Sequence, residues 1–325
     1  MYKIQKSYFC DTSERKFNNS EKMNNILITT GNGMFGKALA EELLKMEVRI
    51  RVMVRDKSKC SIDHPNAEIV TGDMDKPETL KPVMEGIDSV FLSTPMDAKI
   101  AERERNIINA AKENGVQQIV KIYGAVKHEG DQLVEEHQQA FDHLMNSGIS
   151  WTLISPNSVM ETSLLTMSTL IKYMHAIYGC SGKGKVGLVA LKDVTRATAV
   201  VLTSSGHSGQ NYELTGPESL DMTAVAECFT GILGRKIQYI DLSEEKLTRM
   251  IMKFDKTMTP EKLEFEVLCH LRAWRKGQAD LVTDTFKKLT GTEPTSLGSF
   301  IRDNKETFSR GMVPGFIGWF MRRMV

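Results

Sequence analysis

The strongest constraint on the fold is an alternation of short β-branched runs with longer helical segments over the first half of the chain. Each run is rich in Val, Ile and Leu, as expected of buried strands, and amphipathic stretches separate the runs. The runs that predict strands are 25–30, 48–54, 67–72, 88–94, 117–123 and 149–155. Strands that alternate with helices pair in parallel through right-handed crossovers. The sequence therefore predicts an α/β fold with a doubly wound parallel sheet.

This regular alternation loosens after Pro156. Helical patterns dominate there, with short strands predicted near 186–190, 210–214 and 236–241. We interpret 23–156 as the sheet domain and 157–310 as a smaller, mostly helical C-terminal lobe that binds the substrate. Its strands either stay in the lobe or return to the edge of the sheet. We expect a flexible N-terminal arm at 1–22 and an apolar, basic tail at 311–325.

Composition excludes several classes of protein. The 325 residues carry a formal net charge of +1, which gives no reason to expect a nucleic-acid partner. Five dispersed cysteines indicate reduced thiols and a cytoplasmic protein, and no spacing predicts a metal site. No apolar run reaches membrane-spanning length. The expected partner is a small-molecule substrate, and the sequence leaves a homodimer open.

Three glycines mark the first turn between strand and helix. Gly31, Gly33 and Gly36 follow the first strand and open an amphipathic helix. Without Cβ atoms, main-chain amides can approach a pyrophosphate, and the start of a helix adds partial positive charge. Glycines alone also occur in tight turns of other α/β proteins. Their place at the start of the first βαβ unit favours a dinucleotide site.

Arg55 follows the second strand, about twenty residues beyond the glycines, where this kind of fold presents the ribose of a dinucleotide. A guanidinium suits a 2′-phosphate through charge-assisted hydrogen bonds, with Lys57 and Lys59 as neighbouring cations. NADP(H) is therefore predicted over NAD. Two alternatives stay open: a solvated basic turn, or pairing of Arg55 with Asp56.

Several segments resemble the NmrA-like family of atypical short-chain dehydrogenases/reductases. The segments "ITTGNGMFG", "TGDMDKPETL", "VFLSTP", "SGISWTLISPN" and "YELTGPESLDMTAVAECFTGILGR" stand in the family's order. The C-terminal segment "GTEPTSLGSFIRDNKETF" most resembles the branch of NAD(P)H:quinone oxidoreductases and triphenylmethane reductases. The resemblance implies an extended Rossmann domain that binds NADP(H) across the carboxyl ends of its strands.

The resemblance also implies which residues bind the cofactor. They form a pyrophosphate loop, a 2′-phosphate anchor, an adenine-flanking motif, a ribose segment and a nicotinamide end. In that order they are Gly31, Asn32, Gly33, Met34, Phe35 and Gly36; Arg55; Gly72, Asp73 and Met74; Ser93, Thr94 and Pro95; and Pro156, Asn157 and Ser158, with Tyr123 and His137 beside them. A competing role for Asp73 is to cap the helix that follows.

Four departures from the family pattern fall mainly where the reaction occurs. Thr30 stands where the family has one more glycine, and Tyr123-Gly124 replaces a Ser/Thr-Ser pair. Ile154-Ser155-Pro156 replaces Leu-Arg-Pro, and Phe141 takes the place of an acid four residues after His137. The motifs for the cofactor are thus kept, while those for the reaction differ.

Tyr123 and His137 are the candidate catalytic residues. Tyr123 follows the fifth strand, where a phenol can donate to a substrate oxygen or form an aromatic wall. His137 occupies the family's helix position facing the nicotinamide ribose, although a surface histidine is the alternative. Tyr123 and Lys127 have the spacing of a Tyr-x-x-x-Lys motif, which we interpret as coincidence because Gly124 directly follows a strand.

Two functions compete. The first is an NADPH-dependent reductase that transfers hydride to a small, fairly apolar conjugated substrate such as a quinone, enone or imine. The second is a non-catalytic NADP-binding redox sensor that regulates a protein partner, a hypothesis favoured by the altered reaction motifs. The closer resemblance to the reductase branch favours the first.

Overall fold

The computed structural model describes residues 25–124 and 131–309. The predicted arm at 1–22, the tail at 311–325 and Lys127 lie outside the described residues.

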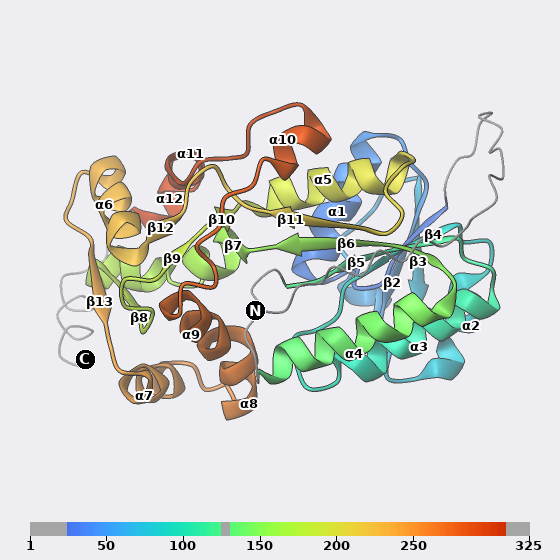
Figure 1. Cartoon of the computed structure of the whole chain (residues 1–325), viewed down its shortest axis with the longest axis horizontal. Helices are drawn as coiled ribbons and strands as arrows, with labels where there is room; N and C mark the ends of the chain where they lie inside the picture. The colour runs from blue at the N-terminus through green and yellow to red at the C-terminus, as the bar shows by residue number, and fades with distance from the viewer. Residues whose placement is uncertain (1–24, 125–130, 310–325) are drawn as a thin grey trace.

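A seven-stranded parallel sheet forms the centre of the first domain (Figure 1). Its strands are β1 (Ile26–Ile28), β2 (Ile50–Val54), β3 (Ala67–Thr71), β4 (Ser89–Leu92), β5 (Gln118–Ile122), β6 (Ser150–Pro156) and β11 (Gln210–Leu214). Their spatial order is β11-β6-β5-β4-β1-β2-β3, and every neighbouring pair is parallel. The order reverses between β1 and β4, which is the switch point of a doubly wound Rossmann sheet. The predicted fold class is confirmed.

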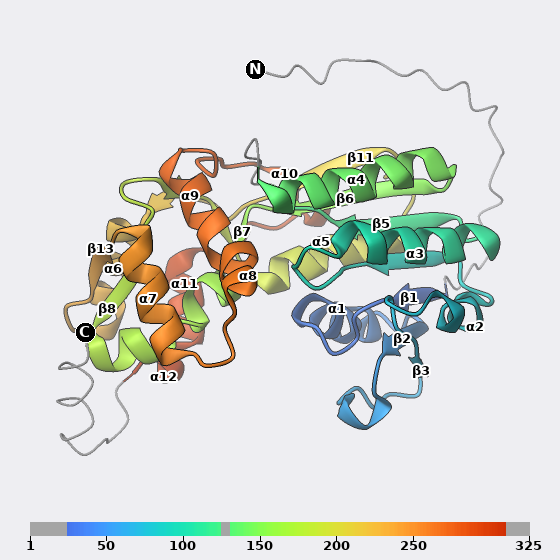
Figure 2. The ribbon, with the colours of Figure 1, turned by 90° about the horizontal axis from the view of Figure 1, so that it is seen from below.

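Helices cover both faces of this sheet, which Figure 1 shows edge-on and Figure 2 shows from the side of α3 and α4. One layer contains α1 (Met34–Lys45), α5 (Leu191–Thr203) and α10 (Thr285–Thr290), and the other contains α2 (Lys81–Met84), α3 (Ile100–Glu113) and α4 (Gln132–Ser147). Strand side chains alternate between the faces. Ile26 and Ile28 pack in the α1–α5 layer, whereas Leu27 packs in the α2–α4 layer. Burial on both faces explains why the central strands β1 and β4 are largely apolar.

The second part of the chain is largely helical. It contains α6 (Met222–Leu233), α7 (Glu244–Phe254), α8 (Pro260–Leu263), α9 (Cys269–Arg275), α11 (Leu297–Asp303) and α12 (Lys305–Phe308). Three two-stranded sheets join β7 (Ser158–Val159) to β10 (Leu188–Val189), β9 (Lys185–Val186) to β12 (Leu220–Asp221), and β8 (Ala176–Gly179) to β13 (Gln238–Asp241). Segment 191–214 leaves this lobe and supplies α5 and β11 to the main sheet.

The segment after β7 is not one continuous α-helix. It contains two π-helical turns, η3 (Glu161–Leu165) and η4 (Leu170–Met174), followed by β8. His175 adopts a left-handed conformation, with φ of 56°, and ends the second turn. Met160 is buried in the core of the lobe, and Met167 and Met174 pack against that core. These three methionines therefore belong to the packing of the lobe.

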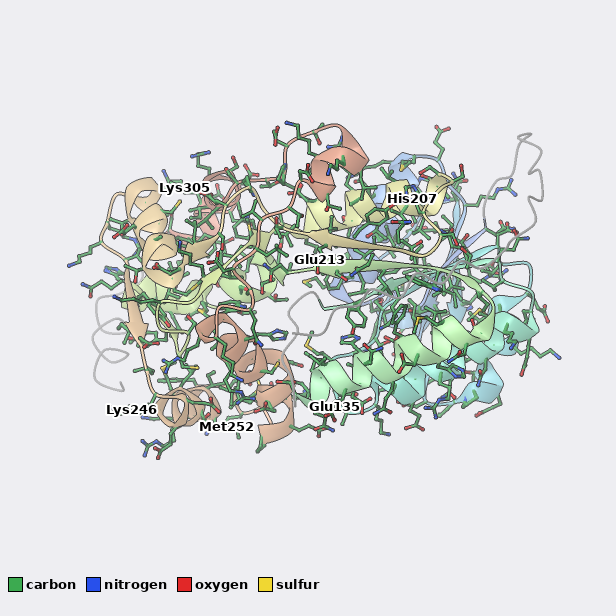
Figure 3. The ribbon with its side chains drawn as sticks, viewed as in Figure 1. Glu135, His207, Glu213, Lys246, Met252 and Lys305 are labelled. Atoms are coloured by element: carbon green, nitrogen blue, oxygen red, sulfur yellow. The ribbon has the colours of Figure 1, made fainter. Side chains whose placement is uncertain are left out.

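A small apolar cluster joins the two parts of the structure. Ile100 at the start of α3 and Leu133 at the start of α4 pack against Phe265 and Cys269 of the C-terminal lobe. Glu135 marks this end of α4 in Figure 3. The contact holds α9 and the π-helical turn η5 (Glu264–Leu268) beside the carboxyl edge of the sheet. Within 25–124 and 131–309, no helix combines the length and apolar character needed to cross a membrane.

Candidate functional site

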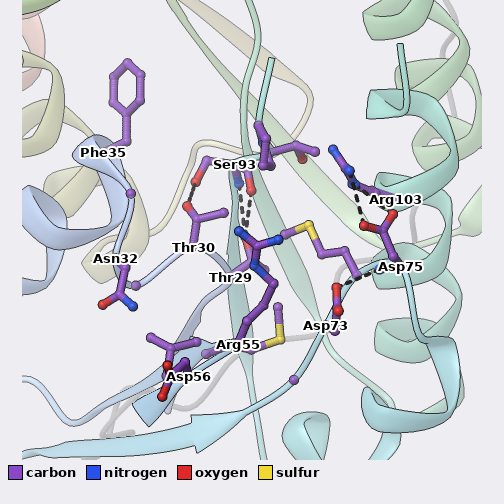
Figure 4. A pocket seen from close by; sticks show the side chains of 18 of the residues that line it. Thr29, Thr30, Asn32, Phe35, Arg55, Asp56, Asp73, Asp75, Ser93 and Arg103 are labelled. Atoms are coloured by element: carbon purple, nitrogen blue, oxygen red, sulfur yellow. Dashed lines mark hydrogen bonds and ion pairs between the residues drawn. The ribbon is translucent and has the colours of Figure 1, made fainter. Parts of the chain in front are cut away.

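A cleft of about 790 Å³ opens at the carboxyl ends of β1, β2 and β4, where the strand order reverses (Figure 4). Cofactor sites in α/β sheets occur at this switch point, and the volume lies in their usual range of roughly 300–1,000 Å³. Twelve residues predicted to bind the cofactor line it: Gly31, Asn32, Gly33, Met34, Phe35, Arg55, Gly72, Asp73, Met74, Ser93, Thr94 and Pro95.

The glycine loop is shaped by close packing. A Cβ atom on Gly31 would lie 2.1 Å from Cγ1 of Val52, and one on Gly36 would lie 2.0 Å from the carbonyl oxygen of Thr30. Gly36 does not line the cleft; it lets α1 approach the loop. No side chain caps α1, and its first turn contains no acid. The first amides of α1 therefore remain available to a diphosphate.

Thr30, which replaces a family glycine, has a partner across the cleft. Its hydroxyl and that of Ser93 form a hydrogen bond. The hydroxyl of Thr29 donates to the carbonyl oxygen of Ser93 (3.0 Å) and accepts from the Ser93 amide (3.2 Å). These bonds fix the loop after β1 against the loop after β4, so this departure from the family pattern leaves the cleft intact.

Arg55 extends from the end of β2 into the cleft (Figure 4). It forms no hydrogen bond or ion pair with the residues that the structure describes. The Asp56 carboxylate instead accepts hydrogen bonds from the Ser58 amide (3.0 Å) and hydroxyl (2.7 Å), and Lys59 lies 3.7 Å away. These bonds hold the pKa of Asp56 below its usual value. The predicted alternative of an Arg55–Asp56 pair is therefore absent from the structure.

The opposite wall of the cleft contains an ion-pair network that the sequence analysis did not identify. Arg103 of α3 contacts Asp75 (2.9 Å) and Asp97 (2.7 Å). The hydrogen bond from Arg103 lowers the pKa of Asp75. The prediction that Asp73 caps the helix that follows is wrong, because the next helix, η2 (Pro77–Thr79), has no side-chain cap. The Asp73 carboxylate instead accepts from the Asp75 amide (3.1 Å) in the preceding turn, and Asp73 lines the cleft as predicted. Arg103 lies in a charged helical run of the kind that usually faces solvent, so its sequence context does not predict this network.

Tyr123 and His137 lie together, outside the set of residues that line the cleft. Their rings are 5.3 Å apart, and the Tyr123 hydroxyl donates to Oε1 of Gln138 (3.3 Å). Tyr123 is 6% exposed, and burial raises its pKa. His137 is partly exposed. Their catalytic and cofactor-binding roles stay predictions.

Pro156, Asn157 and Ser158 are buried between the sheet and the C-terminal lobe, and they also do not line the cleft. The side-chain amide of Asn157 donates to the carbonyl oxygen of Ala279 (2.8 Å), and the Trp274 indole donates to Ser158 Oγ (3.1 Å). Oδ1 of Asn157 is buried and has no partner among the described residues. Their predicted contact with the nicotinamide stays a prediction.

A buried ion pair lies behind the cleft wall. Nζ of Lys121 on β5 is 2.6 Å from Oε2 of Glu104 on α3, and the two side chains are 0% and 1% exposed. The hydroxyl of Thr94, which lines the cleft, donates to Oε1 of Glu104 (3.0 Å). No sequence motif predicts this pair, although a lysine within the otherwise apolar strand "QIVKI" is a detectable signal.

The sequence of this domain matches a known family. Residues 31–173 fit the model of the NAD(P)H-binding family. The match begins at the glycine loop and spans the cleft-lining segments of the Rossmann sheet, so the NAD(P)H-binding family and the geometry indicate the same site.

Individual relatives agree. NAD(P)H azoreductase from Xenophilus azovorans is 27% identical over 291 residues, covering 87% of this chain and 99% of the azoreductase. The structure of NADPH-dependent quinone oxidoreductase 2 from Escherichia coli, complexed with NADPH, is 25% identical with a TM-score of 0.78, covering 86% of this chain and 99% of that one. Citrobacter sp. triphenylmethane reductase complexed with NADP(H) shares the fold, at 22% identity and a TM-score of 0.76, with 86% and 99% covered.

These findings confirm the predicted resemblance to the NmrA-like quinone oxidoreductase branch. They also confirm the prediction of an NAD(P)H-dependent oxidoreductase.

Proposed function

We propose that this protein is an NADPH-dependent reductase that transfers hydride to a small, fairly apolar conjugated compound such as a quinone, enone or imine. The observation that carries the choice of NADPH is the Arg55 guanidinium, which faces the cleft without a carboxylate partner among the described residues. A bound 2′-phosphate would supply that missing anion.

The residues present fit the cofactor. The glycine cradle and the open start of α1 would hold the diphosphate, Arg55 and Lys59 the 2′-phosphate, and Ser93 and Thr94 a ribose. When bound, NADPH supplies the hydride. Tyr123 and His137 would orient the substrate oxygen by hydrogen bonds.

The substrate class rests on the names of the relatives. They act on azo, quinone and triphenylmethane compounds by name, and all three are conjugated. The exposed apolar side chain of Met96, next to the cleft-lining Pro95, is compatible with such a molecule.

The test is NADPH oxidation by the purified chain, followed by absorbance against a panel of quinones, enones, imines and azo dyes. We expect turnover of at least one class above the protein-free rate. Tight NADPH binding with no turnover across the panel would contradict the reductase and favour the NADP sensor.

A further inference from the structure

Four polar side chains form a continuous line from the cleft wall to α4. Thr94 donates to Glu104 (3.0 Å), and Glu104 pairs with Lys121 (2.6 Å). Nζ of Lys121 is also 3.1 Å from Nδ1 of His137. The line joins the loop after β4 to α3, β5 and α4, and it ends at a partly exposed imidazole beside Tyr123.

Stability alone does not explain this line. Lys121 lies in the layer of the sheet that packs against α3 and α4, where its strand neighbour Ile119 is fully buried among apolar side chains. A buried ion pair loses hydration energy that its Coulombic attraction repays only with excellent geometry, and apolar replacements are often as stable. An apolar side chain would therefore serve the core at least as well as Lys121.

The geometry sets the protonation of the imidazole. The pair with Glu104 keeps Lys121 a hydrogen-bond donor, so Nδ1 of His137 accepts from it. A neutral imidazole that accepts at Nδ1 carries its proton on Nε2. The two ring nitrogens point in widely different directions, and Nδ1 faces buried Lys121. Because Lys121 occupies Nδ1, the Nε2 edge is the one that could donate to a ligand.

We propose that the buried Glu104–Lys121 pair is a positioning device that holds His137 as a neutral imidazole donating from Nε2 toward the substrate end of the cleft. This inference rests on the proposed function for the identity of the acceptor, a substrate or ribose oxygen. Burial, followed by the Lys121 charge, holds the pKa of His137 well below its usual value, which agrees with a neutral ring. Lys121 acts through His137 and is a positioning residue.

The direct test is the tautomer of His137 in the full-length chain without cofactor, measured by nitrogen-15 NMR of labelled histidine. The His137→Gln spectrum assigns the signal. We expect the neutral Nε2–H form in the wild type and a mixture of tautomers in Lys121→Met. Lys121→Gln, which retains an N–H donor, should restore the Nε2–H form. A wild-type ring protonated on Nδ1, or a Lys121→Met spectrum identical to wild type, would overturn the proposal.

Two further variants control for folding and for loss of charge. Lys121→Met leaves Glu104 without its cation, so the double variant Glu104→Leu/Lys121→Met provides an apolar replacement that keeps the layer filled. It should fold and show the same tautomer mixture. Lys112→Met removes an exposed lysine from α3 and should leave the His137 signal unchanged.

Kinetics give a second readout, with 2-methyl-1,4-naphthoquinone as the probe. Lys121→Met and the double variant should lower kcat roughly tenfold or more, as for other partners that orient a functional imidazole, with NADPH affinity within about twofold. A folded double variant with wild-type kcat would overturn the proposal. If the wild type turned over no substrate, the proposed function would fail, while the tautomer measurement would still decide the arrangement of Lys121 and His137.

Discussion

The carboxylate of Asp56 accepts hydrogen bonds from both the amide and the hydroxyl of Ser58. Its chain neighbour Arg55 therefore faces the cleft without a direct ion pair among the described residues. The two bonds form a local turn that begins the short 3₁₀ helix η1 (Lys57–Lys59). The Ser58 hydroxyl thus holds the Asp56 carboxylate away from Arg55, and the proposed preference for NADPH depends on this orientation.

Reversing the charge of Arg55 tests its role. Arg55→Glu should weaken NADPH binding by about 100-fold or more and NADH binding far less, because each charge-assisted bond to a phosphate contributes roughly 1.5–3 kcal/mol. Calorimetric titration with each coenzyme measures both affinities. Arg49→Glu is the matched control, since Arg49 is an exposed arginine just before the other end of β2. Equal weakening of NADPH and NADH by Arg55→Glu would remove the 2′-phosphate role.

Removing the Ser58 hydroxyl should release Asp56. Ser58→Ala is expected to weaken NADPH roughly threefold, because the freed carboxylate can pair with Arg55 at the energy of an exposed ion pair. Asp56→Asn added to Ser58→Ala should restore the affinity. Calorimetric titration with NADPH measures the affinity of both variants. If the double variant bound NADPH as weakly as Ser58→Ala alone, Asp56 would not be competing with the 2′-phosphate for Arg55.

The contact of Gly36 with the Thr30 carbonyl predicts a loss of stability on adding a methyl group. Gly36→Ala should lower the free energy of unfolding by about 1–3 kcal/mol and reduce NADPH affinity, since α1 must move away from the loop. Gly231→Ala in α6, where a Cβ atom meets nothing, should be neutral or stabilising by up to about 1 kcal/mol. Urea unfolding of both variants gives the comparison. A Gly36→Ala variant as stable as Gly231→Ala would contradict the packing account.

Removing the Tyr123 hydroxyl tests its proposed hydrogen bond to the substrate. If it donates to substrate, Tyr123→Phe should lower kcat by about 10²-fold with NADPH affinity nearly unchanged. The single described partner of the hydroxyl, Gln138, is exposed, so losing this bond should cost little stability. Steady-state kinetics with the best substrate of the panel gives the answer, and an unchanged kcat would make Tyr123 an aromatic wall.

Acid should destabilise the protein through His137. Its lowered pKa means that the unfolded chain binds a proton near its usual value of about 6.5, whereas the folded chain binds it only at lower pH. In that window the unfolded state holds more protons, so stability rises with pH and is lost as pH falls below about 6.5, by at most about 1.4 kcal/mol per unit. Urea unfolding between about pH 7 and pH 5 should show a smaller loss for His137→Gln than for wild type. Parallel losses would contradict a neutral His137 imidazole.

The sequence predicts the cofactor half of the site well because its constraints are local. Gly31 and Gly36 must lack side chains in any strand-turn-helix unit of this kind, and Arg55 follows from its distance along the chain. The Asp56 side-chain direction and the Arg103 network depend on contacts that no spacing encodes. Lys121 and Glu104 lie on separate elements and meet only through the order of β4 and β5 in the sheet. The π-helical turns after β7 likewise depend on packing within the C-terminal lobe.

The central claim is that the loop from Gly31 to Gly36, with Arg55, binds NADPH. Isothermal titration calorimetry of the wild-type chain with NADPH and with NADH tests it most directly. The account predicts one site per chain with NADPH bound more tightly than NADH and a raised unfolding temperature in its presence. Absence of heat and of thermal protection with NADPH would contradict it.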